Sequence, residues 1–173
     1  HNVVATRMGK CKQENRLRAW CKSLGVYGLK SEHKFIPAQY LEADRDTRIQ
    51  LLQGLMDTDG TAGKNGDVQF SSSSKTLAEQ VQYLVRSLGG KATLNFKKTT
   101  HLDHWVVHIV LKDRAQLFNL PRKKDRVAHE RTKHTNHRLT LSSIDYVGDD
   151  ECQCIQVSHP SHLYVTDDFV VTH

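Results

Sequence analysis

The stretch LLQGLMDTDG (residues 51–60) constrains the fold of this chain more than any other. Its apolar residues fall at helical spacing and predict a buried helix. Gly54 lies inside that helix, where a glycine costs about 1 kcal/mol relative to alanine. Such a glycine is tolerated where a second helix comes so close that a Cβ atom would clash. Gly54 therefore predicts a close helix–helix contact, and Asp57 and Asp59 predict a site at the helix end. The alternative is a helix that merely tolerates Gly54, with both acids in a turn.

Hydrophobic periodicity along the rest of the chain predicts an α+β fold. Helices are expected over 12–24 and from an N-cap at Asp46 to the end of the motif. A third is expected over 76–88, with Thr76 and Glu79 as a capping box, and a short fourth over 113–120, which Pro121 closes. Strands are expected over 68–71, 92–96 and 104–111, with residues 60–66 as a turn. Two helices over an antiparallel sheet form one α+β unit.

The character of the sequence changes near residue 135. Beyond it, ECQCIQV, HLYV and DDFVVT read as short strands, with no helix between them. We therefore expect three parts, over 1–29, 30–135 and 136–173. The last part is too short for a core of its own. It is expected to complete a sheet begun elsewhere in a longer parent chain or to pack on the first domain.

Charge favours a nucleic-acid partner. The formal net charge is +6, and the segment 121–138 carries seven Lys and Arg against two acids, which is +5 of that total. The alternative for this segment is a solvated linker. No apolar run approaches the roughly 18 residues that a membrane span needs, so we expect no membrane partner and a cytoplasmic location. The four cysteines lack the spacing of a zinc site and are expected to be reduced thiols.

LQGLMDTDG (residues 52–60) resembles the LAGLIDADG signature of homing endonucleases. The lead-in KFIPAQYLEADRDTRIQ, and the strand, helix and double glycine of VQFSSSSKTLAEQVQYLVRSLGGKATLNF, are similar to the second endonuclease repeat inside inteins. The resemblance covers about residues 30–125. It implies a metal-dependent, site-specific endonuclease of double-stranded DNA. In that family two such helices pack face to face, and each delivers one acid to a divalent metal.

Site residues follow from this resemblance by position. Asp59 is the implied ligand of Mg²⁺, and Asp57 caps or supports the helix end. Lys123 matches a lysine that the family places near the scissile phosphate, with Lys124 next best and ordinary phosphate or solvent contact as the alternative. The exposed sheet face would read bases through Gln69, Ser71, Asn95, Lys97 and His108, and phosphates would meet Lys97, Lys98 and the basic block with Arg122, Lys124 and Arg126. Only one motif is found, so a first repeat or a dimer partner is expected.

CIQVSHPSHLYVTDDFVVTH (residues 154–173) resembles the C-terminal splicing blocks of inteins, which implies the β-strands of a Hint-type splicing domain. The implied chemistry is C-terminal cleavage by Asn cyclisation, without a cofactor. His173 would donate a proton to the departing amine, and His162 would assist proton transfer. Cys154 would tune the thioester steps or act as a nucleophile; the alternative is a small buried strand residue. We expect the required Asn to follow His173 in the parent chain.

The sequence thus favours the C-terminal part of an intein that carries an endonuclease. Its expected partners are DNA, the N-terminal intein portion with the first repeat, and the flanking exteins. Two alternatives remain open. One is an intein that only splices, with a degenerate endonuclease. The other is a non-catalytic DNA-binding regulator of LAGLIDADG-like fold, which would have no need of HLYVTDDFVVTH.

Overall fold

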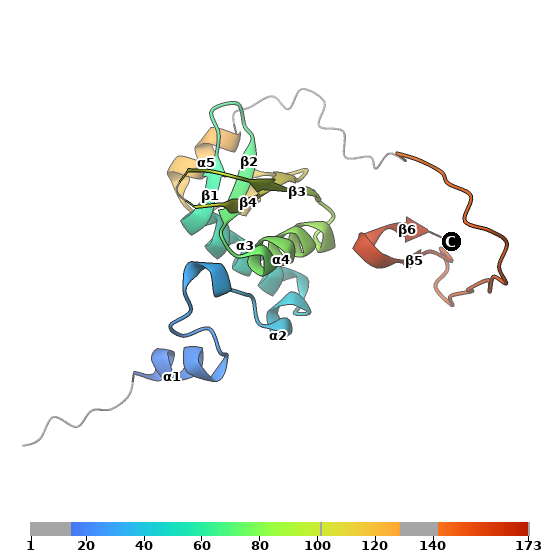
Figure 1. The fold of residues 1–173 in the computed structure, drawn as a ribbon, viewed down its shortest axis with the longest axis horizontal. Coiled ribbons are helices and arrows are strands. Elements are labelled where there is room, and N and C mark those ends of the chain that lie inside the picture. The colour runs from blue at the N-terminus through green and yellow to red at the C-terminus, as the bar shows by residue number, and fades with distance from the viewer. Residues whose placement is uncertain (1–14, 101, 129–141, 173) are drawn as a thin grey trace, which may run out of the picture.

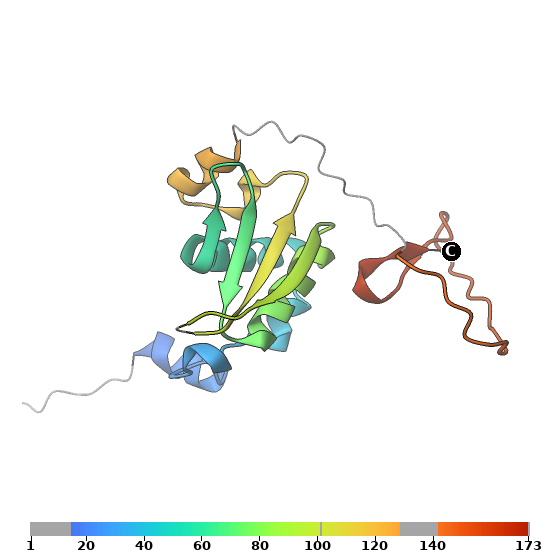
Figure 2. The ribbon, with the colours of Figure 1, turned by 45° about the horizontal axis from the view of Figure 1, so that its top comes forward.

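The computed structural model describes residues 15–100, 102–128 and 142–172, and its centre is an antiparallel sheet covered on one face by helices (Figure 1). The strands are β1 (Gly60–Ala62), β2 (Val68–Ser72), β3 (Lys91–Lys97) and β4 (His104–Val110), in the order β1-β2-β4-β3. Helices α3 (Arg45–Asp59) and α4 (Lys75–Ser87) pack on the same face. Figure 2 shows the other face of the sheet uncovered, with both helices behind it. The expected α+β unit is therefore present.

The alternation of side chains along the strands separates a core face from an open face. On the core face, Phe70 and Val107 are fully buried and Ile109 is nearly so. The partners on α3 are Leu52 and Met56, both buried. From α4 the buried side chains are Leu77, Ala78, Val81, Leu84 and Val85. This layer of apolar contacts orients α3 and therefore fixes where the end of α3 lies.

Helix α3 begins two residues earlier than its sequence indicates. Asp44, and not Asp46, is the N-cap: its Oδ1 accepts hydrogen bonds from the backbone N–H groups of Asp46 and Thr47 at 3.0 Å each. The Thr47 hydroxyl also donates to Asp44 Oδ2 at 2.6 Å. Both aspartates offer a suitable cap, and the Thr47 hydroxyl adds a bond that only Asp44 receives.

Helix α4 is capped by Ser74, so the predicted capping box of Thr76 and Glu79 is wrong. Ser74 Oγ accepts from the N–H of Leu77 at 3.1 Å and donates to the carbonyl oxygen of Lys34 at 2.6 Å. Glu79 instead lies 3.4 Å from Lys75 as an exposed ion pair. A second anchor for residues 34–36 is Gln80, whose amide exchanges two hydrogen bonds with the backbone of Ile36.

Two elements of the first domain were not expected. Strand β1 pairs with β2 where a turn was predicted, because the chain becomes extended at Gly60 as soon as α3 ends. The short helix expected over 113–120 is the 3₁₀ helix η2 (Ala115–Leu117), and Pro121, expected only to close it, starts α5 (Pro121–Ala128). Proline is suited to the first position of a helix, since its missing N–H would be unpaired there.

The N-terminal segment forms an apolar groove against α3. It contains α1 (Arg16–Ser23), the 3₁₀ helix η1 (Ser31–His33) and α2 (Ala38–Leu41). The groove measures about 420 Å³ and is lined by residues that include Trp20, Leu24, Phe35, Tyr40, Leu51 and Leu55. Leu51 and Leu55 belong to α3, so the groove continues onto that helix.

The C-terminal residues contain fewer strands than predicted. Residues 151–157 (ECQCIQV) form no strand, and Ile155 is 59% exposed. A strand requires a partner for its backbone groups, and no described segment pairs with these residues. A small hairpin of β5 (Tyr164–Val165) and β6 (Val171–Thr172) encloses the 3₁₀ turn η3 (Asp167–Phe169). This turn contacts α4 through an Arg86–Asp168 ion pair and a Tyr83–Phe169 ring contact at 5.0 Å.

The boundary expected near residue 135 lies outside the described residues. Among the residues that are described, no helix has the length and apolar character that crossing a bilayer requires.

The cap at Asp44 generates a pH prediction. Its hydrogen bonds, first that from the Thr47 side chain, lower the pKa of the Asp44 carboxyl from 3.8. A carboxylate with a depressed pKa stabilises the fold above its unfolded value, and that contribution is lost as pH falls through the folded value. Asp44→Asn keeps an uncharged cap that does not titrate. The difference in Tm between wild type and Asp44→Asn, measured by circular dichroism, should shrink from about pH 6 to about pH 3. A difference that stays constant would contradict the cap assignment.

Candidate active site at the end of α3

Asp59 is the last residue of α3, and its side chain is exposed. Directly after it, buried Gly60 closes the helix by donating its N–H to the carbonyl oxygen of Met56. A Cβ atom on Gly60 would lie 2.5 Å from that same oxygen, which leaves no room for a side chain. The motif glycine therefore lets the chain pass from helix to β1 in one step, and this sharp junction presents Asp59 at the surface.

Asp57 does not share the orientation of Asp59. Its Oδ1 accepts from the backbone N–H groups of Asn119 at 3.0 Å and Leu120 at 3.1 Å, directly before α5 begins. One turn earlier, Gln53 donates to the carbonyl oxygen of Gln116 at 2.8 Å. Asp57 was expected to cap or support the end of its own helix, and it instead satisfies the N–H groups that lead into α5.

Lys123 makes the reverse connection from α5 to α3. Its Nζ donates to the carbonyl oxygens of Met56 and Asp57 at 2.8 Å each and of Gly60 at 2.6 Å. Burial and then the charge of Arg122 lower the pKa of Lys123, against the opposing effect of Asp57 and Asp59. Sequence analysis expected this lysine at the scissile phosphate, which stays a prediction. The hydrogen bonds of its Nζ all go to backbone carbonyl oxygens, and the same ammonium group lies 5.8 Å from the centre of the Phe118 ring. We call the pair Asp57 and Lys123 the α3–α5 clasp.

The outward face of α3 is open around Gly54. A Cβ atom placed on Gly54 would have no heavy atom within 4 Å outside the helix backbone. Thr58, one turn later, is also exposed, and Leu51 and Leu55 are only half-buried. These four residues follow helical spacing and form one stripe beside the apolar groove. The helix contact that Gly54 predicts is therefore not made by any described residue of this chain.

The register of the sheet brings the predicted base-reading residues onto the open face. Gln69 lies opposite His108, which in turn lies opposite Thr93 on β3. Ser71 and Asn95 flank Val106 in the neighbouring row. Lys97, the last residue of β3, alternates onto the same face and is exposed. Thr93 was missed by sequence analysis, although the alternation that selected Asn95 and Lys97 also selects it.

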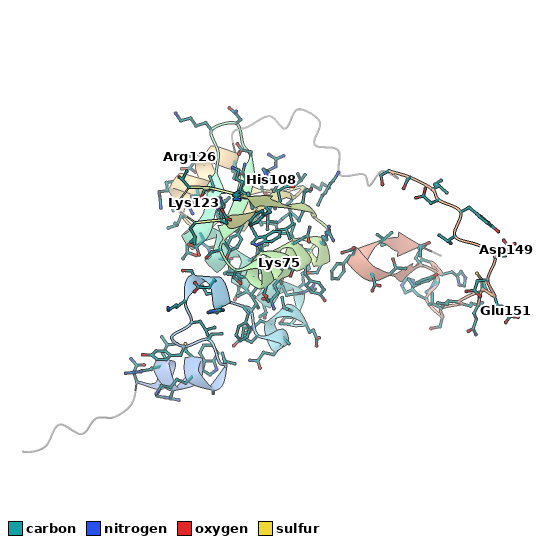
Figure 3. The ribbon with its side chains drawn as sticks, viewed as in Figure 1. Lys75, His108, Lys123, Arg126, Asp149 and Glu151 are labelled. Atoms are coloured by element: carbon teal, nitrogen blue, oxygen red, sulfur yellow. The ribbon has the colours of Figure 1, made fainter. Side chains whose placement is uncertain are left out.

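Further basic side chains lie on α5 and directly after β3. Arg122 and Lys124 are exposed on α5, and Lys98 is exposed directly after β3. Arg126 is exposed and donates to the carbonyl oxygen of Ala62 at 3.4 Å, which ties α5 to the end of β1. In Figure 3 Lys123 and Arg126 lie on the side of the sheet where α5 packs. The rest of the predicted basic block, residues 129–138, lies outside the described residues.

The chemistry of the α3 end fits one hard cation. Among the described residues, no group of three or more His, Cys, Asp and Glu could enclose a metal. Mg²⁺ does not need such a cage, because it keeps several waters and takes one or two carboxylates together with substrate phosphates. The exposed Asp59 is a suitable oxygen ligand of this kind. It supplies one carboxylate, and waters, substrate phosphates and at most one further carboxylate would complete the coordination.

The predicted splicing residues lie apart from this site. His162 is exposed, has a positive φ of 55°, and its Nδ1 lies 3.3 Å from the carbonyl oxygen of Val157. Cys154 is a free, exposed thiol outside any strand, so the alternative of a buried strand residue is wrong. Cys21 and Cys152 are free thiols as well, as expected. His173 lies outside the described residues.

Comparison with known proteins places these features in a family. A family model described as a LAGLIDADG-like domain matches residues 46–146. The chain is 32% identical over 155 residues to a replicative DNA helicase DnaB from Mycobacterium intracellulare, covering 86% of this chain and 26% of that protein. It is also 32% identical over 111 residues to the DnaB helicase of Synechocystis, covering 61% of this chain and 13% of that protein. A DnaB helicase from Rhodothermus marinus is 28% identical over 142 residues, which cover 78% of this chain and 14% of that protein. The chain therefore spans about a quarter or less of the length of these relatives.

Proposed function

Because this chain belongs to the family of LAGLIDADG-like domains, we propose that it forms one half of a metal-dependent endonuclease centre for double-stranded DNA. The observation that carries the proposal is the end of α3. There an exposed Asp59 stands at a helix-to-strand junction that Gly60 and the α3–α5 clasp hold closed. LAGLIDADG endonucleases generally use divalent metals, and Asp59 has the oxygen chemistry that Mg²⁺ prefers.

Asp59 acts in this proposal as a metal ligand. A bound Mg²⁺ supplies Lewis acidity to the scissile phosphate and lowers the pKa of an attacking water. The residues of this chain perform the other tasks. Asp59 holds the cation at the end of α3, Gly60 keeps that end free of a side chain, and exposed Lys124 contributes positive charge for a phosphate.

In this proposal the open face of the sheet binds DNA. Gln69, His108 and Thr93 form a row of polar side chains across three strands. In the neighbouring row, Ser71 and Asn95 lie on either side of Val106. Side chains of this kind hydrogen-bond to base edges in the major groove. Lys97 and Lys98 at the end of β3, and Arg122 and Arg126 on α5, supply positive charge of the kind that neutralises phosphates.

The second half of the centre comes from a first LAGLIDADG repeat or a dimer partner. Gly54 and its neighbours leave a stripe of α3 open, and the apolar groove continues from it. A second helix on that stripe would bring its own terminal acid next to Asp59. Close approach of two backbones at Gly54 explains why a glycine is kept inside α3.

The wider protein is proposed to be an intein within a replicative helicase, acting in the cytoplasm with its host. Two observations support this. Relatives named DnaB match the chain over a quarter or less of their length, as expected of a segment inserted in a longer protein. Residues 154–173 also resemble C-terminal splicing blocks. In this proposal His162 and His173 move protons during C-terminal cleavage, and Cys154, whose thiol is exposed, takes part in the thioester steps.

Asp59→Asn tests the metal role. In the complete two-repeat protein, this change should abolish nicking of target DNA while DNA binding stays largely intact, because the amide removes a charged ligand and nothing from the sheet face. Nicking is measured on a plasmid that carries the target, and binding by gel shift without Mg²⁺. Unchanged cleavage would count against Asp59 as a ligand.

Gly54→Ala tests the helix pairing with opposite effects on two measurements. The isolated chain should become more stable by up to about 1 kcal/mol, because a Cβ atom meets open space and alanine favours helix. Association with the first repeat, measured by analytical ultracentrifugation, should weaken because that Cβ atom would separate the two helices. Unweakened association would contradict the pairing surface.

His173→Ala tests the splicing proposal. In a complete intein assembled with its N-terminal portion and with Asn after residue 173, C-terminal cleavage should slow, because the departing amine loses its proton donor. Cleavage products are quantified by gel electrophoresis over time. Cleavage at the wild-type rate would rule out this role for His173.

A further inference from the structure

The side chain of Lys123 hydrogen-bonds to the backbone at the end of α3. Its Nζ donates to the carbonyl oxygens of Met56, Asp57 and Gly60 at 2.6 to 2.8 Å. An ammonium group has three N–H donors, so all three are used within the protein. Resting on the proposed nuclease function, we propose that Lys123 is a positioning residue, which holds the last turn of α3 closed and so fixes where Asp59 presents its carboxylate.

The electrostatics of a helix end explain why a cation is needed here. The last carbonyl groups of a helix carry a partial negative charge equivalent to roughly half an electron. Asp57 and Asp59 add two carboxylates to the same turn. A DNA phosphate that approaches Asp59 therefore meets a strongly negative region. Lys123 places a fixed positive charge among these carbonyl groups, which lowers the repulsion without taking a ligand position from Asp59.

The other half of the α3–α5 clasp places Lys123. Asp57 accepts hydrogen bonds from the N–H groups of Asn119 and Leu120, the two residues before α5 starts at Pro121. Lys123 lies in the first turn of that helix, and its own N–H bonds to the carbonyl oxygen of Leu120 at 3.0 Å. Each helix thus holds the end of the other. Loss of Asp57 would release the turn that carries Lys123.

The basic residues next to Lys123 on α5 have a different environment. This difference allows a positioning role to be distinguished from contact with a phosphate. Arg122 and Lys124 are exposed, whereas Lys123 is half-buried against α3. Lys123 positions the helix end in this assignment, and Lys124 is available to DNA. Lys124 is therefore a matched control, with the same side chain on the next residue of the same helix.

The experiment compares Lys123→Met with Lys124→Met. In the whole chain, without DNA or metal, amide hydrogen exchange is followed by NMR. Lys123→Met should speed exchange at Gly60, whose N–H bonds to Met56, by about tenfold or more, and Lys124→Met should leave it unchanged. If Lys123 served only to contact phosphate, exchange at Gly60 in the free protein would match wild type, and that result would overturn the proposal.

A second measurement uses the complete two-repeat protein. The Mg²⁺ concentration for half-maximal cleavage should rise several-fold in Lys123→Met at a temperature well below its Tm, with DNA affinity measured without Mg²⁺ little changed. A loss of DNA affinity at an unchanged Mg²⁺ requirement would also overturn the proposal. If the wild-type protein does not cleave DNA, the proposed function fails, but exchange at Gly60 still decides whether Lys123 orders the helix end.

The reciprocity of the clasp supplies a further check. The gain in exchange rate at Gly60 for Asp57→Ala with Lys123→Met should be smaller than the product of the two single gains, because each change already loosens the other contact. If Lys123→Met does not fold, Lys123→Gln, which keeps two N–H donors, replaces it in every comparison. Multiplicative effects would show that the two contacts act independently and would contradict the clasp.

Discussion

Two side chains that cross between α3 and α5 hold the candidate active site in shape. Asp57 satisfies the backbone that leads into α5, and Lys123 satisfies the carbonyl groups that end α3. The partners lie more than 60 residues apart in sequence. These contacts therefore join an early helix of the domain to its last one. Asp57 is directed into the protein by this arrangement and Asp59 remains at the surface. The two acids of one motif therefore have separate tasks, one structural and one directed outward.

The domain has a complete core and an incomplete site. Phe70, Met56 and Val107 are fully buried between the sheet and its helices, so folding does not depend on a partner for these contacts. The stripe around Gly54 and the open face of the sheet are left uncovered by the described residues. An uncovered sheet face fits a polar ligand, and an uncovered helix stripe with a glycine fits another helix. Within the proposed function these are the places of the DNA and of the second repeat.

Sequence periodicity predicted the features that repeat along an element, and it missed those that depend on distant residues. Alternation assigned Gln69, Asn95 and His108 to one face correctly, because strand pairing preserves a period of two. The cap of α4 was misassigned to Thr76, since Ser74 is fixed by the Lys34 carbonyl group far back in the chain. Likewise, no local pattern shows that Lys123 ends on three carbonyl oxygens of another element. The expected strand over 151–157 failed because strand propensity requires a partner strand.

The C-terminal hairpin is anchored on α4, on the side of the sheet opposite to the open face. Asp168 and Phe169 touch the helix that covers the core face of the sheet, through Arg86 and Tyr83, whereas the row of Gln69, His108 and Thr93 lies on the opposite face. Within the proposed function, substitutions on the open face can therefore alter or abolish DNA binding without affecting the contacts that anchor the hairpin. This separation of the two surfaces would allow the proposed endonuclease activity to be lost by mutation while the proposed splicing activity persists.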